Sequence, residues 1–327
     1  MSRLSKTLSF VAFVTAMIQA ICAVGAESAW PTRPVRIIVP FAAGGVHDLA
    51  ARLYADGLAK RWGQPVVIEN KPGAETNIGT AAFTSAHDDH TLLYGVTSTL
   101  TVNPLVFERM AFDPVRDVVP ISAGASVIIL VAVHTGVPAR SLTELAHVAQ
   151  GEPGKLLWGS GPVLPRYVFI AFLKRRGLDM LYVPYRDVAT PQADLGEGRL
   201  QVLVTSVPAS VAPVQSGNAR IIAVTNAQRA PMLPDVPTVA EAGYPEMTID
   251  GLAGFFGWRD IPEALRDKIS ADVQAVAQDP DVRARMTASG LLVLGTTPAQ
   301  FTAAIEAQRV RIGEIARLID LKAAINK

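Results

Sequence analysis

The sequence predicts an α/β protein of two lobes, each a mainly parallel sheet flanked by helices. The chain has 327 residues, which is enough for about two domains. Half of the residues are hydrophobic and 18% are charged, a composition typical of globular proteins with a large core. Short β-branched segments alternate with helical patterns over the first third of the chain. The same alternation restarts at about residue 127, which predicts a second lobe.

The first lobe begins with a buried strand over residues 35–39, a β-branched run that ends at Pro40. A helix follows, because Leu49, Leu53 and Leu58 recur at helical spacing and Gly63 supplies a stop. The remaining predicted elements of this lobe are a strand over 66–68, a helix after Asn77 and a strand over 91–94.

The second lobe begins with a strongly apolar strand over residues 127–133. A helix over 141–149 follows, with Ser141 as its cap and Glu144 as the capping-box partner. The remaining predicted elements are strands over 156–158, 181–183, 200–204 and 221–225 and a helix over 165–176.

The C-terminal tail is predicted to be mostly helical, with helices over 262–277 and 298–319. We therefore assign residues 27–123 plus 225–327 to lobe I and residues 124–224 to lobe II. Neither crossing between the lobes is rich in Ser or Gly, which favours a hinge of short strands over a flexible linker.

Residues 1–26 read as a cleaved signal peptide. Arg3 and Lys6 precede an apolar run over 8–24, and small residues follow at 24–26. An uncleaved membrane anchor is the alternative, since the run is nearly long enough to span a bilayer. The single cysteine, Cys22, lies in this segment, so the mature chain would have neither a disulfide nor a reactive thiol. The sequence thus predicts a periplasmic protein.

Charge excludes recognition of a polyanion. Lys and Arg number 30 and Asp and Glu 29, so no broad basic field exists to attract nucleic acid. Ligand recognition must therefore be local.

The most informative segment is the turn over residues 40–48. A strand ends, Gly44 and Gly45 allow a tight turn, and a helix begins. Free N–H groups and the dipole at a helix N-terminus favour an anion, and in an open α/β sheet ligands lie beyond the carboxyl ends of the strands. A plain tight turn is the alternative. The segment has neither the P-loop nor the dinucleotide-binding pattern.

From residue 30 onward the chain resembles the periplasmic receptors of tripartite tricarboxylate transporters, often called the Bug family. The resemblance rests on the joint order of these segments: residues 30–41 (WPTRPVRIIVPF), Gly44 and Gly45 with Asp48 and Arg52, residues 63–74 (GQPVVIENKPGA), 77–80 (NIGT), 103–104 (NP), 183–185 (VPY) and 233–243 (LPDVPTVAEAG).

The resemblance implies a type II periplasmic-binding-protein fold that closes on a small organic carboxylate without chemistry on it, and without a cofactor or metal. The implied partners are membrane permease subunits, or alternatively a sensor kinase, and the receptor would act as a monomer. The implied ligand-binding residues of lobe I are Phe41, Ala42, Gly44, Gly45, His47, Asp48, Asn77, Gly79, Thr80, Thr97 and Ser98. Those of lobe II are Ser160, Arg166, Tyr185, Arg186 and Thr205.

Several of these residues depart from the family pattern. His47 stands where Ser or Thr is usual, and if its ring holds the anion, affinity should rise as it is protonated below pH ~6.5. Residues 164–167 (LPRY) replace a Thr-Ser-x-His pattern, and Thr205 replaces an Asp. Arg166 and Arg186 could clamp a second carboxylate; the alternative is a solvated arginine at each position.

Two further possibilities are weaker. Residues 87–90 (HDDH) lack metal-ligand spacing and are predicted to form a solvated turn. A periplasmic hydrolase is a remote alternative, because no nucleophile motif is present.

Overall fold

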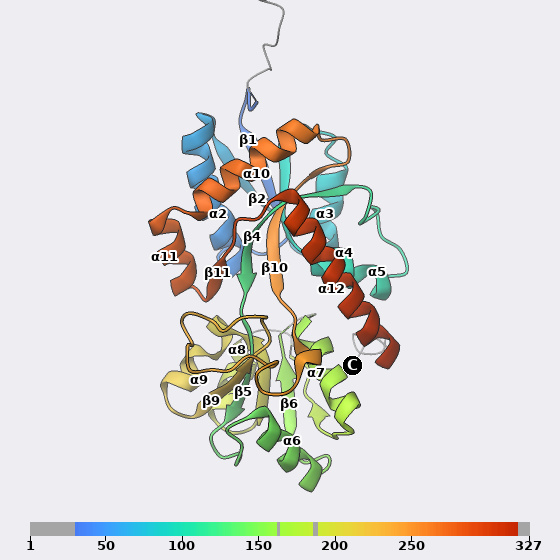
Figure 1. Cartoon of the computed structure of the whole chain (residues 1–327), viewed down its shortest axis with the longest axis vertical. Helices are drawn as coiled ribbons and strands as arrows, with labels where there is room; N and C mark the ends of the chain where they lie inside the picture. Colours follow the sequence, from blue (N-terminus) through green and yellow to red (C-terminus); the bar gives the residue numbers. More distant parts are fainter. Residues whose placement is uncertain (1–29, 162–163, 186–188, 320–327) are drawn as a thin grey trace, which may run out of the picture.

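The computed structural model describes residues 30–161, 164–185 and 189–319. In Figure 1 the chain forms an upper and a lower lobe, each built on one sheet with helices around it. The predicted two-lobed α/β class is thereby confirmed. The predicted signal peptide, with Cys22, lies outside the described residues. Within the described ranges, no helix has both the length and the hydropathy needed to cross a bilayer.

The sheet of lobe I has six strands in the order β11-β4-β10-β3-β1-β2. Its strands are β1 (Val35–Val39), β2 (Val66–Asn70), β3 (Thr91–Val96), β4 (Val118–Val127), β10 (Gly251–Trp258) and β11 (Leu291–Val293). Its helices are α2 (Val46–Trp62), α3 (Asn77–Thr84), α4 (Ser98–Thr101), α5 (Asn103–Val106), α10 (Glu263–Ala277), α11 (Pro280–Ala288) and α12 (Pro298–Leu318). β1 pairs in parallel with both β2 and β3, as the alternation of strands and helices predicts.

The sheet of lobe II has five strands in the order β7-β6-β8-β5-β9. Its strands are β5 (Ile129–His134), β6 (Leu157–Ser160), β7 (Leu181–Tyr182), β8 (Val202–Ser206) and β9 (Ala219–Val224). Its helices are α6 (Leu142–Gly151), α7 (Leu164–Arg176), α8 (Ala189–Gly196), α9 (Val211–Gln215) and two short 3₁₀ turns, η1 (Val207–Ser210) and η2 (Pro245–Met247). The Ser141 hydroxyl caps α6 by accepting from the Glu144 N–H, as predicted.

Both sheets are mixed, whereas the sequence predicted mainly parallel ones. β10 lies between β3 and β4 and is antiparallel to both. β5 lies between β8 and β9 and is likewise antiparallel to both. These two strands enter their sheets from the other lobe and not through a helical crossover, which is the connection that makes neighbouring strands parallel.

Residues 225–250, which the sequence assigned to lobe I, pack on lobe II. Val224 bridges to Thr238, and the Ile249 N–H donates to the Thr225 carbonyl at 2.9 Å. Ala230, Val239, Tyr244, Met247 and Ile249 are buried in the hydrophobic clusters of lobe II. The return crossing therefore falls at about Asp250. Its position could not be predicted because this Pro-rich segment has no helical or strand period.

Asn226 joins the two crossings. Its Oδ1 accepts from the Ile129 N–H at 3.2 Å, just after the first crossing. Its Nδ2 donates to the Ser126 Oγ at 3.1 Å and to the Asp250 Oδ1 at 3.0 Å. The side chain is 1% exposed, so the hinge is a buried hydrogen-bond network.

α12 also connects the lobes. Figure 1 shows it running from the upper lobe down to α7. Gln308, on its buried face, donates to the Asp250 carbonyl at 2.9 Å and accepts from Thr101 at 3.0 Å. Ile312 and Ile315, one and two turns later, pack into the main cluster of lobe II.

Candidate functional site

A cavity of about 200 Å³ lies between the lobes. It lies beyond the carboxyl ends of β1 and β3, where ligands bind in open α/β sheets. Lobe I and the two crossing strands contribute Phe41, Val46, His47, Glu75, Thr76, Val96, Ser98, Val127, Gly251 and Leu252. Lobe II contributes Ile129, Gly161, Leu164, Pro165, Thr205 and Ser206.

The β1–α2 loop brings the start of a long helix to this cavity. Gly44 has φ 83°, a left-handed conformation that favours glycine, and Gly45 precedes α2 in an extended conformation. The N–H groups in the first turn of a helix have no partner within the helix, and no side chain caps α2. Val46 and His47, in that turn, line the cavity.

Asp48 stabilises the β1–α2 loop by hydrogen bonds and does not line the cavity. Its Oδ2 accepts from the Gly44 N–H and from Arg52 Nε, each at 2.9 Å, and its Oδ1 accepts from Asn70 Nδ2 at 2.8 Å. Asn70 also donates to the Phe41 carbonyl at 3.1 Å. Burial by itself raises the pKa of Asp48, but the hydrogen bonds from Arg52, Gly44 and Asn70 outweigh it and the pKa is lowered. Asp48 is thus an ionised positioning residue.

The surroundings of His47 favour its neutral form. Its ring stacks on Phe41 with centroids 4.1 Å apart. Desolvation by burial lowers the pKa of His47 from 6.5 to about 4. The expected protonation below pH ~6.5 is therefore shifted to much more acidic conditions, because desolvation disfavours the charged ring.

The second lobe I loop carries backbone strain. Ala74, Glu75 and Thr76 have φ values of 46°, 49° and 75°, a region that residues with a side chain rarely adopt. Asn103 Nδ2 donates to the Glu75 carbonyl at 2.7 Å, and the Thr76 hydroxyl contacts that of Thr99. The loop presents Glu75 and Thr76 to the cavity.

Asn77, Gly79 and Thr80, also predicted from the sequence, support these two loops. Asn77 Oδ1 accepts from Asn103 at 2.9 Å, and the Thr80 hydroxyl donates to the Thr76 carbonyl at 3.0 Å. A Cβ on Gly79 would lie 2.7 Å from the Lys71 carbonyl oxygen and 2.7 Å from the Cβ of Pro40. Gly79 therefore permits α3 to pack closely against the end of β1.

Three more predicted residues of lobe I have distinct surroundings. Thr97 is buried and donates through its N–H to the Leu252 carbonyl at 3.0 Å, whereas Ser98 lines the cavity. Ala42 lies on the exposed outer side of the β1–α2 loop.

The predicted residues of lobe II occupy different environments. Thr205 lines the cavity. Ser160 is buried outside the lining. The Tyr185 hydroxyl donates to Asp194 Oδ2 at 2.8 Å, and the Arg166 guanidinium lies 5.2 Å from the centroid of the Tyr182 ring. Arg186 falls outside the described residues.

Phe41, His47, Ser98 and Thr205 are thus the predicted side chains that the fold brings to one cavity. Sequence reasoning missed Glu75, Thr76, Ile129, Leu164 and Ser206, which also line it. Glu75 and Thr76 directly precede the Asn77 segment and could have been found from that position. The apolar lining has no sequence signature distinct from that of a core.

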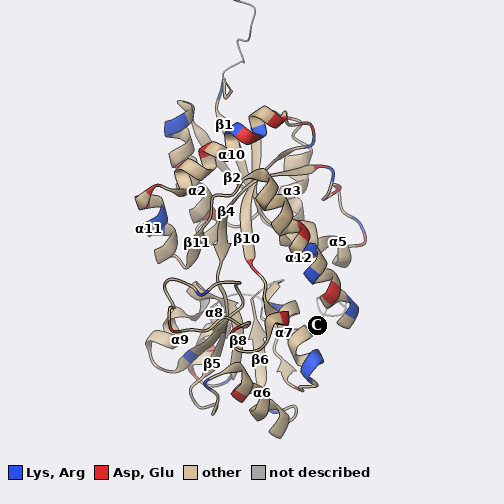
Figure 2. Cartoon of the chain, in the orientation of Figure 1, with Lys and Arg blue, Asp and Glu red and all other residues tan. Residues whose placement is uncertain are grey.

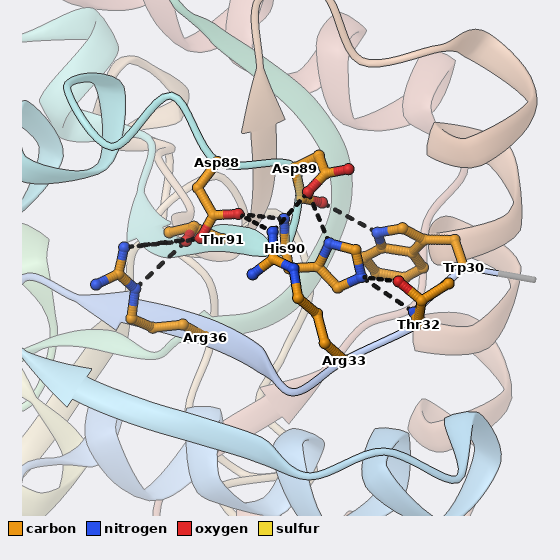
Figure 3. A network of polar contacts seen from close by, with 8 residues as sticks. All are labelled: Trp30, Thr32, Arg33, Arg36, Asp88, Asp89, His90 and Thr91. Atoms are coloured by element: carbon orange, nitrogen blue, oxygen red, sulfur yellow. Dashed lines mark hydrogen bonds and ion pairs between the residues drawn. The ribbon is translucent and has the colours of Figure 1, made fainter. Parts of the chain in front are cut away.

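Residues 87–90 form a turn before β3, as the sequence predicts, with His87 and Asp89 exposed. A network of side-chain contacts also holds Asp88 and His90, which the sequence does not predict (Figure 3). Asp88 and Asp89 both accept from Arg33, at 2.6 and 2.8 Å. His90 is 3% exposed; its Nε2 accepts from the Thr32 N–H at 3.1 Å, and its Nδ1 lies 2.7 Å from Asp89 Oδ1. The three side chains could geometrically hold a metal. His90 Nε2 accepts from Thr32, its Nδ1 pairs with the Asp89 carboxylate, and both carboxylates accept from Arg33, so these atoms already have protein partners. The network instead attaches residues 30–33 to lobe I.

Comparisons with known proteins agree with this architecture. The model of the tripartite tricarboxylate transporter family receptor matches residues 50–321. A Pseudomonas sp. (strain P51) protein, the UPF0065 protein in the tcbD-tcbE intergenic region, is 31% identical over 274 residues, 83% of this chain and 81% of that protein.

Two solved structures are also similar. R. palustris Rpa4515 with adipate has a TM-score of 0.76 and 30% identity, covering 88% of this chain and 98% of that one. MatC from Rhodopseudomonas palustris with bound malate has a TM-score of 0.72 and 27% identity, covering 88% and 99%. The chain therefore belongs to the tripartite tricarboxylate transporter receptor family, whose members are periplasmic solute-binding proteins.

Proposed function

We propose that this protein captures a small organic carboxylate in the cavity between its lobes and delivers it, as a monomer, to a tripartite membrane permease. Export by the N-terminal signal peptide precedes this role, and binding leaves the ligand chemically unchanged. The observation that carries the proposal is the uncapped start of α2, which opens into an interlobe cavity.

Physical chemistry favours a carboxylate at this position. The first-turn N–H groups of a helix point along its axis beyond the N-terminus, and the dipole of the 17-residue helix α2 adds positive potential at its start. His47 is neutral, so it neither repels a cation nor attracts an anion by charge. Backbone dipoles therefore supply the recognition.

The distribution of charge is consistent with local recognition. In Figure 2, basic and acidic residues are interspersed over both lobes of the described chain. Such a surface provides little long-range steering, so selectivity depends on groups inside the cavity. The solved neighbours with adipate and malate support a carboxylate as the class of ligand.

Native mass spectrometry of the freshly purified protein is the first test, because a receptor can retain its ligand through purification. Thermal-shift screening of mono- and dicarboxylates then follows on the ligand-free protein. A carboxylate at about 100 times its Kd should stabilise the fold by about 2.7 kcal/mol. Stabilisation by a sugar or a cation alone, with no response to any carboxylate, would contradict the proposal.

A further inference from the structure

The part of the cavity away from α2 is largely apolar. Val127 and Ile129 line it at the first crossing, and Leu164 and Pro165 line it at the start of α7. Leu164 is 6% exposed and belongs to the main hydrophobic cluster of lobe II. Thr205 and Ser206 add hydroxyls, which carry no charge. A ligand group placed here loses water without gaining an ionic partner from these residues.

Among the described lining residues, Glu75 is the one acidic side chain, and none is Lys or Arg. The strained backbone at φ 49° is held by the bond from Asn103 to the Glu75 carbonyl. Strain of this kind persists where the surrounding contacts enforce it, and it is concentrated at functional sites. The start of α2 favours one anion in the cavity, and Glu75 places a negative charge in the same cavity.

The influence of Glu75 extends across the cleft to lobe II. Burial raises the pKa of the Tyr167 hydroxyl, the Arg166 charge opposes this, and the Glu75 charge adds to the increase. Tyr167 lies on α7, one turn after Leu164. Arg166 acts on this hydroxyl more strongly than Glu75, but it is not among the residues that line the cavity. A second carboxylate inside the cavity would therefore meet Glu75 and an apolar wall.

We infer, on the basis of the proposed function, that Glu75 and the apolar wall restrict the ligand to one carboxylate with an uncharged, apolar far end. Glu75 is a specificity-determining residue in this view, because it disfavours dicarboxylates. Since it is exposed, it keeps its own hydration and needs no cationic partner from the ligand.

Three six-carbon acids test the inference, because they differ only at the far end: hexanoate, adipate and 6-aminohexanoate. We expect calorimetric titration of ligand-free protein to give hexanoate an affinity at least about tenfold higher than that of adipate, from like-charge repulsion and lost hydration. In Glu75→Gln the same ratio should fall by about threefold or more. Glu263→Gln, an exposed change on α10, is the matched control and should leave the ratio unchanged.

The outcomes separate the two proposals. If adipate or 6-aminohexanoate binds best to the wild type, the restriction is wrong while the proposed function stands. An unchanged ratio in Glu75→Gln, with a normal melting temperature, would refute the role of Glu75. If none of the three binds and a wider carboxylate panel also fails, the proposed function itself is wrong.

Discussion

Substituting Val46 with proline tests whether the backbone at the start of α2 holds the ligand. Val46 is the first residue of the helix, the position at which proline is best tolerated because its N–H has no intrahelical partner. Gly45 has φ −78° and ψ 170°, the extended conformation that a residue before proline requires. Val46→Pro therefore deletes one N–H donor at the start of α2, at a residue that lines the cavity, and leaves the helix intact.

The expected loss follows from the charge of the ligand. A hydrogen bond to an ionised group contributes about 1.5–3 kcal/mol, which corresponds to a loss of affinity of about 10- to 100-fold. Val46→Ala is the matched control, because it removes the same side chain from the cavity wall and keeps the N–H. Calorimetric titration with a carboxylate identified by screening measures both variants, and thermal unfolding checks that both fold.

The decisive comparison is between the two variants. If Val46→Pro binds as well as Val46→Ala, the N–H of the first helical residue does not hold the carboxylate, and the backbone mechanism is wrong. A larger loss in Val46→Ala than in Val46→Pro would mean that side-chain packing dominates at this position.

Three further predictions concern the supports of the site. Asp48→Asn should lower the free energy of unfolding by about 1–3 kcal/mol, because an amide cannot accept from all of Gly44, Arg52 and Asn70. Denaturant titration measures this loss, with Asp56→Asn as the control. Equal losses in the two variants would refute the role of Asp48 in stabilising the β1–α2 loop. Affinity should stay constant from pH 8 to pH 5.5, because the pKa of His47 is about 4; a rise that His47→Phe abolishes would contradict this. Asn226→Leu should destabilise the protein by about 3 kcal/mol through unpaired hinge groups, and thermal unfolding close to that of the wild type would show that the hinge tolerates the loss.

His47 also predicts how stability varies with pH. Its folded pKa lies below the ordinary value of 6.5, so the unfolded chain binds a proton that the folded chain excludes. Stability should therefore fall as the pH drops from about 6.5 towards 4. Asp48 acts further down the scale: its lowered pKa gives a stabilising contribution that is complete above about pH 4 and is lost in stronger acid.

Predictability from sequence differed between the segments of the site. The turn at Gly44 and Gly45 was found because glycine spacing, the end of a strand and the start of a helix coincide within a few residues. The supporting role of Asp48 was not found, since its partner Asn70 lies on the next strand and only pairing of β1 with β2 brings it near. The position of the Arg166 guanidinium 5.2 Å from the centroid of the Tyr182 ring is not predictable from sequence, because β7 brings Tyr182 near only in the folded lobe.

β10, a central strand of the lobe I sheet, could not be predicted from local sequence. β10 has the sequence GLAGFFGW, and its glycines weaken any strand prediction. A Cβ on Gly254 would lie 2.4 Å from the Ser122 carbonyl oxygen, so the close packing of β10 against β4 requires glycine at this position. The same glycine makes β10 difficult to predict as a strand. Its place between β3 and β4 results from contacts more than 100 residues apart in the chain.

The sequence by itself determined the α/β class, the restart of the strand–helix pattern at about residue 127, the family resemblance and the loop that begins α2. Each of these depends on residues that are close together along the chain, where periodicity, glycine and proline act directly on the backbone. The tertiary structure decided that both sheets are mixed, that residues 225–250 pack on lobe II, and that Glu75, Leu164 and Ile129 line one cavity. These depend on which distant surfaces bury each other, a property of the whole chain that local patterns do not encode.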